Sequence, residues 1–561
     1  MLNLRHIRTV WAGLMGFALA TSAVIAEGPK LPKKLRENID QRIAAKSAPA
    51  FVVGLVGPDG VTWLCRGTYS FDDSTKVTPK TVFEIGSITK AFTGILLADS
   101  ARRGTVKLDD PIDKFLPESV AAPNFDGRQI TLLDLAQHRS GLPRLPTNFD
   151  MTADPRNPYA HYSVDRLYEF LNGYKLTRSP GANYEYSNLG AGLLGHILGL
   201  ANKKAYEDLV EERICRPLGM IDTVFTLTDD QRKRLAPGHD GPARTSNWDS
   251  FEAMSAAGAL LSTGADMITF VEANLGFRES KLAATLADSI EPRADTQTPN
   301  VRIGLGWHIS NDKGTEIIWH NGGTGGYRAF CGFAPSKKLG VVVLTNSSES
   351  ADDIGFHLLE KKYRLKRPEK TASVSEEVLN RYVGYYELAP GMIIQITLSG
   401  GTLYAQLTGQ DAAPVYPRSE TEFAYRIVQA RLTFQRNDDG TIESVTLHQN
   451  GRNMPAKRLP DDYQPPAPRQ SIELPVEVLK RYEGRYQLTP GMIFDVKLEG
   501  KQLTVMLTGQ PRFPLFAASE TEFFLKVVDA QITFNVDESD RATSLTLHQS
   551  GMDQIATRIT E

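Results

Sequence analysis

The sequence is poor in cysteine and has no excess of either charge. Three cysteines occur in 561 residues, at Cys65, Cys215 and Cys331, without a Cys-x-x-Cys pair or a Cys/His cluster. So sparse and odd a set predicts buried structural thiols and argues against a disulfide framework or a thiolate zinc site. Lysine and arginine number 63 against 66 acidic residues, so the net charge of −3 gives no electrostatic basis for binding nucleic acid.

Long apolar runs are also missing. Arg5 and Arg8 precede an apolar run of 11 residues at 10–20, and small residues follow up to Ala26. A membrane span needs about 20 apolar residues, whereas this pattern is typical of a cleavable secretory signal. We therefore predict a signal peptide at residues 1–26 and a secreted or periplasmic protein with no stable membrane span after its removal. The alternative is an uncleaved N-terminal anchor.

The C-terminal third of the chain contains a duplication. Three segments recur at an offset of 100 residues: Leu-Thr-Gly-Gln at 407–410 and 507–510, Ser-Glu-Thr-Glu-Phe at 419–423 and 519–523, and Thr-Leu-His-Gln at 446–449 and 546–549. In each copy, apolar and polar residues alternate between Gly and Asp/Asn turns, which predicts a small antiparallel β-barrel. We predict four segments: a signal peptide (1–26), a large N-terminal domain (27–365), β-barrel repeat 1 (376–460) and β-barrel repeat 2 (474–561).

The large N-terminal domain mixes strands with long helices. Strand patterns occur at 51–56 and 61–64 and again near the end of the domain, at 316–319, 327–333 and 339–345. Between them, apolar residues recur at helical spacing at 87–103, 189–201 and 265–275. Helices grouped between terminal strands predict an α+β domain whose strands pair in one antiparallel sheet.

Three short motifs are candidates for catalysis: Ser87-Ile88-Thr89-Lys90, Tyr186-Ser187-Asn188 and His320-Asn321-Gly322-Gly323. A second Ser-x-x-Lys at 310–313 lies in a polar turn pattern, whereas Ser87 stands where a long helix begins. Unpaired N–H groups and the helix dipole favour negative charge there, and the i, i+3 spacing lets the Lys90 amine approach the serine hydroxyl. Lys90 can accept a proton only if desolvation or a nearby cation lowers its pKa, and Tyr186 can share that proton.

Each of these residues also fits a structural role when it is considered alone. Ser87 fits an N-cap, Lys90 a solvated charge and Tyr186 a packed aromatic ring. The catalytic interpretation is favoured because the three motifs occur together and in order. Further segments of the chain fit the same family pattern as these motifs.

Taken together, the motifs resemble those of the serine β-lactamase and D-peptidase superfamily, close to its class C β-lactamase branch. The resemblance extends over residues 45–350 and includes segments at 83–87, 108–112, 138–143, 216–220 and 256–263. It implies a β-lactamase/transpeptidase-like catalytic domain. A catalytic domain followed by two β domains looks most like the arrangement in bacterial D-aminopeptidases.

The resemblance implies roles for the residues of the first two motifs. Ser87 is expected to be the acylated nucleophile, with Lys90 and Tyr186 as the proton-transfer pair. Which of the two is the general base stays open. Asn188 is expected to hydrogen-bond Lys90 or the substrate.

The third motif is expected to form the opposite wall of the site. The resemblance implies that the N–H groups of Ser87 and Gly323 form the oxyanion hole and that Gly322 lets the substrate backbone come close. His320, grouped with the catalytic residues, stands where β-lactamases carry the lysine of a Lys-Thr-Gly motif. Histidine is mostly neutral at pH 7 and a poorer anchor for a carboxylate, so strong penicillin hydrolysis is not expected.

These features together predict an exported serine hydrolase that cleaves amide bonds of D-amino-acid-containing peptides, as a D-aminopeptidase or a D-alanyl peptidase. Its partner would be a small peptide, amide or ester, including cell-wall fragments; no nucleic acid, metal or organic cofactor is expected. The alternatives are a carboxylesterase, a weak class C-type β-lactamase, and a penicillin-binding-like protein that binds or senses without turnover. Substrate choice is expected to depend on loops 144–162 and 226–249, and Glu185 is a weak candidate for binding a free amine.

Overall fold

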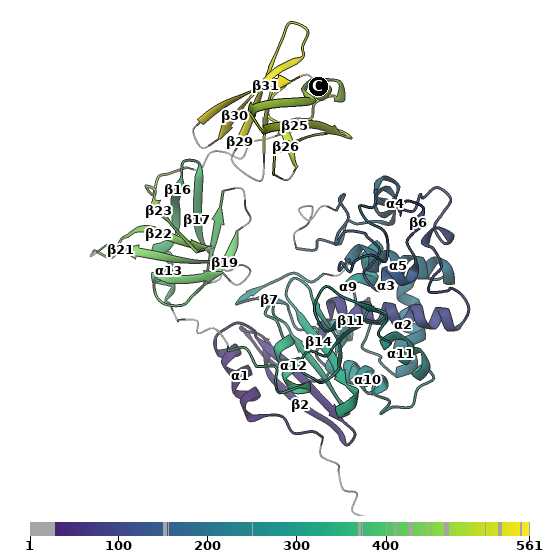
Figure 1. The fold of residues 1–561 in the computed structure, drawn as a ribbon. Helices are drawn as coiled ribbons and strands as arrows, with labels where there is room; N and C mark the ends of the chain where they lie inside the picture. Colours follow the sequence, from purple (N-terminus) through teal and green to yellow (C-terminus); the bar gives the residue numbers. More distant parts are fainter. Residues whose placement is uncertain are drawn as a thin grey trace, which may run out of the picture.

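The computed structural model shows an N-terminal domain followed by two β-barrels (Figure 1). The predicted signal peptide lies outside the described residues, among which no helix is both long and apolar enough to cross a membrane. The described residues are 28–149, 154, 156–248, 251–367, 372, 374–399, 401–408, 410, 412–425, 430–437, 439–449, 451–464, 471–510, 512–525, 530–549 and 552–559.

The N-terminal domain is built on one antiparallel sheet, which confirms the predicted α+β class. β15 pairs with β1, with Phe51 opposite Thr345, so the two ends of the domain meet inside the sheet. The nine strands follow the order β10 (Ala294–Asp295), β11 (Val301–Ile303), β12 (His308–Ser310), β13 (Ile317–Gly323), β14 (Arg328–Ala334), β15 (Leu339–Thr345), β1 (Ala50–Gly57), β2 (Gly60–Ser70) and β3 (Asp73–Lys76).

Helices cover both faces of this sheet. Successive side chains of a strand point to opposite faces, and all of β1 is buried. Phe51 and Val53 pack in one core with α1 (Lys33–Ala44) and α12 (Asp352–Leu359), whereas Val52 packs in the core formed with the helices on the other face. Burial of each such apolar side chain contributes about 1.5–3 kcal/mol, which makes these two cores the main source of stability for the domain.

The helices that carry the first two motifs lie on the second face, close to the predicted bounds. α2 (Thr89–Arg102) and α5 (Asn188–Asn202) pack against one another, and the Ser187 hydroxyl caps α5 by accepting a hydrogen bond from the Gly190 N–H (2.8 Å). The same side holds α3 (Leu132–Ala136), α4 (Val164–Gly173), α9 (Ser255–Gly258), α10 (Gly264–Asn274) and α11 (Ala283–Ile290).

Both C-terminal repeats are closed eight-stranded antiparallel barrels, as predicted. Each repeat begins with a short helix that strand alternation did not predict, α13 (Glu376–Tyr382) and α14 (Val476–Leu479). The strands are β16 (Gly384–Ala389), β17 (Met392–Ser399), β18 (Thr402–Leu407), β19 (Ala413–Pro417), β20 (Glu422–Tyr425), β21 (Ala430–Arg436), β22 (Ile442–Gln449) and β23 (Arg452–Arg458), then β24 (Gly484–Thr489), β25 (Met492–Glu499), β26 (Gln502–Leu507), β27 (Phe513–Ala517), β28 (Glu522–Phe524), β29 (Ala530–Val536), β30 (Ala542–Gln549) and β31 (Met552–Ile559).

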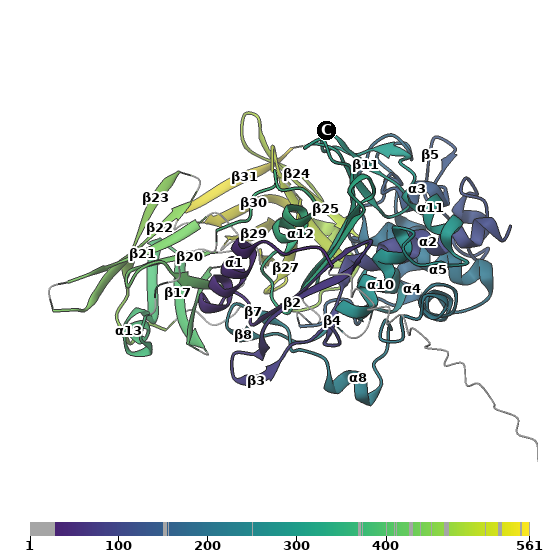
Figure 2. The same ribbon diagram turned by 90° about the horizontal axis from the view of Figure 1, so that it is seen from below.

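The first barrel contacts the N-terminal domain at a small hairpin. β7 (His239–Asp240) and β8 (Ala243–Arg244) are joined through Gly241, whose φ is 56°. A β-carbon at Gly241 would lie 2.5 Å from the ring of Tyr416 in β19, so the hairpin turn and the barrel touch directly. Figure 2 shows this barrel on the side of α1, away from α2 and α5.

Candidate active site

Ser87 lies in the turn that precedes α2. It is the middle residue of a 3-10 turn (Gly86–Ile88). The α-helix begins at Thr89, whereas the sequence pattern predicted a start at residue 87. The Thr89 hydroxyl donates to the Gly86 carbonyl (2.7 Å) and accepts from the Leu260 N–H (3.2 Å). These bonds fix the turn while its serine side chain remains half-buried at the surface of the site.

Lys90 is enclosed one turn further along the chain. Its Nζ lies 3.1 Å from Ser87 Oγ, 2.9 Å from Asn188 Oδ1 and 2.6 Å from the Ala257 carbonyl oxygen. Burial lowers the pKa of Lys90 well below its usual value, and the nearby charge of Arg144 lowers it further. Asn188 Oδ1 and the Ala257 carbonyl oxygen can only accept hydrogen bonds. A neutral Lys90 amine therefore directs its two hydrogens to these two oxygens. Its lone pair is then left for the serine hydroxyl.

Tyr186 packs against Lys90, Arg144 and His138. The centroid of its ring lies 4.9 Å from Lys90 Nζ, 5.1 Å from the guanidinium carbon of Arg144 and 4.5 Å from the centroid of the His138 ring. Burial raises the pKa of Tyr186 to about 12, although a hydrogen bond with Ser87 acts in the opposite direction. Tyr186 therefore keeps its proton at neutral pH and can donate it.

The loop before α5 is held by hydrogen bonds to residues of an earlier segment of the chain. The Ser187 N–H donates to His138 Nδ1 (3.2 Å), and its hydroxyl donates to the Pro143 carbonyl (2.7 Å). The Asn188 side chain donates to the Tyr159 hydroxyl (2.9 Å), so this amide joins Lys90 to an aromatic wall. The motif is thus positioned by groups from a different part of the chain.

The third motif brings the backbone of β13 against the turn that holds Ser87. A β-carbon at Gly322 would overlap the carbonyl oxygen of Ile85 and would lie 3.1 Å from the Ser87 nitrogen. Only glycine permits this approach. The approach also brings Gly323 beside the same turn, because a β-carbon at Gly86 would lie 2.6 Å from the Gly323 nitrogen.

His320 is a neutral group in this site. Its side chain is 0% exposed, and burial holds its pKa well below the usual value. The ring centroid lies 6.4 Å from that of Tyr186, and Nδ1 is 2.6 Å from the Asn321 carbonyl, so Nδ1 carries the hydrogen. His308 beside it has a pKa lowered to about 4 by burial. Neither imidazole is a cation at neutral pH.

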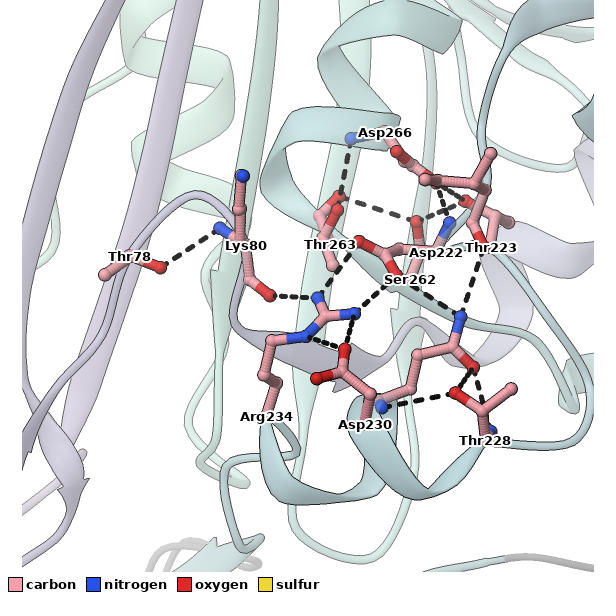
Figure 3. Close-up of polar contacts among 12 residues, drawn as sticks. Thr78, Lys80, Asp222, Thr223, Thr228, Asp230, Arg234, Ser262, Thr263 and Asp266 are labelled. Carbon is pink, nitrogen blue, oxygen red and sulfur yellow. Dashed lines mark hydrogen bonds and ion pairs between the residues drawn. The ribbon is translucent and has the colours of Figure 1, made fainter.

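The strand that leads to the nucleophile motif is anchored by an ion-pair network (Figure 3). β4 (Val82–Glu84) pairs with β9 (Leu261–Thr263), and the Val82 N–H donates to the Arg234 carbonyl (2.8 Å). The Arg234 guanidinium donates to both carboxylate oxygens of Asp222, at 2.6 and 3.0 Å. Such paired bonds are directional, so they hold this segment in register.

The structure brings the seven predicted residues around one site, which comprises Ser87, Lys90, Tyr186, Asn188, His320, Gly322 and Gly323. Four further groups contact the site without a predicted role: the Ala257 carbonyl, His138, Tyr159 and Arg144. The first two lie in segments that carried the family resemblance. Tyr159 and Arg144 belong to no motif, and the only signal for them was their place in loop 144–162.

The thiols form no disulfide, and no metal cluster is evident in the part of the chain that is described. Cys65, Cys215 and Cys331 are all free, and the last two are buried. No group of three or more His, Cys, Asp or Glu side chains among the described residues is arranged to hold a metal ion.

Comparison with known families gives the class to which this fold and site belong. A family model described as beta-lactamase matches residues 35–360, more than half of the chain. A model described as a domain of unknown function (DUF3471) matches both barrels, at 368–458 and 468–559. The protein belongs to the β-lactamase family, within the serine β-lactamase/transpeptidase superfamily.

Curated relatives include peptide hydrolases. The D-alanyl-D-alanine-carboxypeptidase/endopeptidase AmpH of Escherichia coli is 33% identical over 280 residues, which cover 48% of this chain and 71% of that protein. The unguisins hydrolase ungD' of Aspergillus campestris is 28% identical over 361 residues, covering 60% of this chain and 66% of that one. Protein flp of Staphylococcus aureus is 26% identical over 381 residues, covering 66% and 74%.

Solved structures share the fold at lower identity. An octameric penicillin-binding protein homologue from Pyrococcus abyssi aligns with a TM-score of 0.53 at 23% identity, covering 76% of this chain and 99% of that one. A class C β-lactamase aligns with a TM-score of 0.52 at 22% identity, covering 59% and 96%.

Proposed function

We propose that this protein is a serine hydrolase that forms an acyl-enzyme at Ser87 and cleaves amide bonds of D-amino-acid-containing peptides. The contacts of Lys90 carry the proposal. A solvated or ion-paired lysine would be charged and could not take a proton. This amine is buried and accompanied by two obligate acceptors, Asn188 Oδ1 and the Ala257 carbonyl.

In the first step, Lys90 acts as the general base. Its lone pair takes the Ser87 hydroxyl proton across 3.1 Å while Oγ bonds to the substrate carbonyl carbon. The carbonyl oxygen becomes negative and is stabilised by the N–H groups of Ser87 and Gly323. These donors sit on elements fixed before substrate binds, so little reorganisation accompanies the reaction.

In the second step, Tyr186 acts as the general acid. Its pKa of about 12 keeps the phenol protonated until the leaving nitrogen needs a proton, and charged Lys90 can then restore it. The bond between the carbonyl carbon and nitrogen breaks, leaving an ester on Ser87. Water, activated by the same groups, releases the acid and regenerates the serine.

Among D-peptidases, we favour a D-alanyl carboxypeptidase over a D-aminopeptidase. The relative AmpH bears the first name and matches at 33% identity. An aminopeptidase would use a carboxylate to bind the free amine, but Glu185 is ion-paired with Arg178. Export through residues 1–26 is a further part of the proposal and rests on the sequence pattern alone.

Release of D-alanine from an N-blocked D-Ala-D-Ala peptide tests the proposal. The purified protein should release it and should gain the mass of an acyl group on Ser87, whereas Ser87→Ala should do neither. Parallel assay with D-alanine p-nitroanilide would identify the aminopeptidase instead. If neither substrate is cleaved and Ser87 is labelled by no ester or penicillin, the protein is a binding protein and the proposal is wrong.

An esterase is the second candidate, and His320 favours it over a β-lactamase. A neutral buried imidazole cannot hold the carboxylate of a penicillin as a lysine would. Esters with good leaving groups need neither that contact nor a strong proton donor. Hydrolysis of aryl esters alone, without D-alanine release, would support this candidate.

A further inference from the structure

We propose that Arg144 binds a carboxylate of the substrate, so that the enzyme prefers substrates with an anionic group close to the reacting carbonyl. This inference rests on the proposed function, because it takes Ser87 as the reacting centre. It concerns specificity and assigns Arg144 no proton transfer.

The backbone of Arg144 is fastened to the catalytic motif. Its carbonyl oxygen accepts the N–H groups of Asn188 (3.0 Å) and Leu189 (3.2 Å) at the start of α5. The preceding residue, Pro143, accepts the Ser187 hydroxyl (2.7 Å). The same bonds that orient the loop containing Tyr186 therefore set the position of Arg144 at the rim of the site.

The Arg144 side chain is exposed and has no anionic partner among the residues that the structure describes. Its guanidinium carbon lies 5.1 Å from the centroid of the Tyr186 ring, and no described carboxylate lies within 4.0 Å of it. Neighbouring arginines are occupied: Arg139 donates to the Gly181 carbonyl, and Arg178 pairs with a glutamate. A planar guanidinium left free beside reacting groups matches the geometry of a carboxylate.

The charge balance of the site also favours an anion here. Burial lowers the pKa values of Lys90 and of the imidazoles of His138, His308 and His320, which disfavours a lasting positive charge on any of these groups. The guanidinium of Arg144 is the cationic group that remains beside them. The missing anchor at the His320 position is therefore supplied from the opposite wall.

Three matched esters test the inference and locate the anion. Phenyl acetate is neutral, monophenyl succinate carries a carboxylate on the acyl side, and 3-acetoxybenzoate carries it on the leaving group. The protein should hydrolyse one of the anionic esters with a kcat/KM at least tenfold above that of phenyl acetate. Arg144 also lowers the pKa of Lys90, so the readout is the ratio of kcat/KM for the anionic ester to kcat/KM for phenyl acetate, which Arg144→Gln should lower about tenfold. If Arg144→Gln slows hydrolysis of monophenyl succinate, the carboxylate binds on the acyl side. If it slows hydrolysis of 3-acetoxybenzoate, the carboxylate binds on the leaving-group side.

Arg232→Gln is the matched control, because Arg232 is also exposed, lies on the small helix α8 (Asp229–Lys233) and shares no contact with Tyr186. An equal fall on all three esters would mean that Arg144 acts through Tyr186 and Lys90, and the inference would be wrong. It would also be wrong if the protein showed no preference for either anionic ester. Ser87→Ala separates the two proposals: ester hydrolysis that survives this change contradicts the proposed nucleophile itself.

Discussion

Gly322 lies against Ile85 so closely that a β-carbon at residue 322 would overlap the Ile85 carbonyl oxygen. This contact joins the middle of β13 to the turn containing Ser87, although more than 230 residues separate them in sequence. The two N–H groups proposed for the oxyanion hole come from these two segments. The distance between these two N–H groups therefore depends on residue 322 having no β-carbon.

Gly322→Ala should impair catalysis by moving β13 away from the turn. A displaced oxyanion donor costs about 10²–10³-fold in kcat, so we expect a loss of that size in ester and amide hydrolysis. Gly173→Ala is the control, since a β-carbon at Gly173 would meet nothing within 4 Å. Circular dichroism and the melting temperature should show that both variants fold. Full activity in folded Gly322→Ala would contradict the proposed oxyanion hole.

The pH dependence of kcat/KM should follow Lys90 on the acid side. The base form of the lysine is the neutral one, so activity should rise with pH through its lowered pKa and then reach a plateau. Tyr186, with a pKa of about 12, should keep its proton across that plateau. Initial rates on an aryl ester from pH 4 to 10 would measure this. Activity that appears only near pH 10.5 would mean that Lys90 is an ordinary charged amine.

Tyr186→Phe should separate the roles of the two proton carriers. If Tyr186 is the general acid, amide hydrolysis should fall by about 10²–10⁴-fold, because an amine leaving group needs a proton. An aryl ester, whose phenolate leaves without one, should be acylated at nearly the normal rate. Stopped-flow acylation with both substrates would measure the difference. An equal loss on both would identify Tyr186 as the base in place of Lys90.

Much of the fold followed from local patterns, because strands and helices that face a core repeat their apolar residues. The strands at 339–345 and 51–56 were predicted from composition and alternation, and both barrels from their repeat. The order of strands was not predictable: β1 pairs with β15 through contacts that span the domain. Helices α13 and α14, with 7 and 4 residues, are too short to show a helical period.

The site was predictable as a set of side chains but not as an electrostatic environment. Ser87, Lys90 and Tyr186 stood in motifs. The Ala257 carbonyl accepts a hydrogen of Lys90 and directs it away from Ser87. Every residue has a backbone carbonyl, so the sequence cannot show which one takes this role. Likewise, the proposal of Lys90 as the base and Tyr186 as the acid rests on the burial of both groups, and burial arises from packing between distant segments.

The first barrel contacts the β7–β8 hairpin, and the chain runs from this hairpin to the active site. From Gly241 the chain continues to Asn247 and Trp248, which contact the Glu84 carboxylate two residues before the turn that holds Ser87. The barrel therefore touches a segment that supports the catalytic turn. Tyr416 is the barrel residue that meets the hairpin, and the equivalent position in the second repeat is Phe516.

Gly241→Val should loosen the first barrel without unfolding either domain. Its side chain would meet the Tyr416 ring at 2.5 Å, in addition to the strain of a positive φ of 56°. Gly127→Val supplies the control, because Gly127 has φ 81° but no neighbour within 4 Å, so it isolates the backbone strain. We expect faster proteolysis between the N-terminal domain and the first barrel in Gly241→Val alone, together with at least a twofold change in kcat/KM on bulky esters. Identical digestion and kinetics in the two variants would mean that the hairpin contact does not hold the barrel in place.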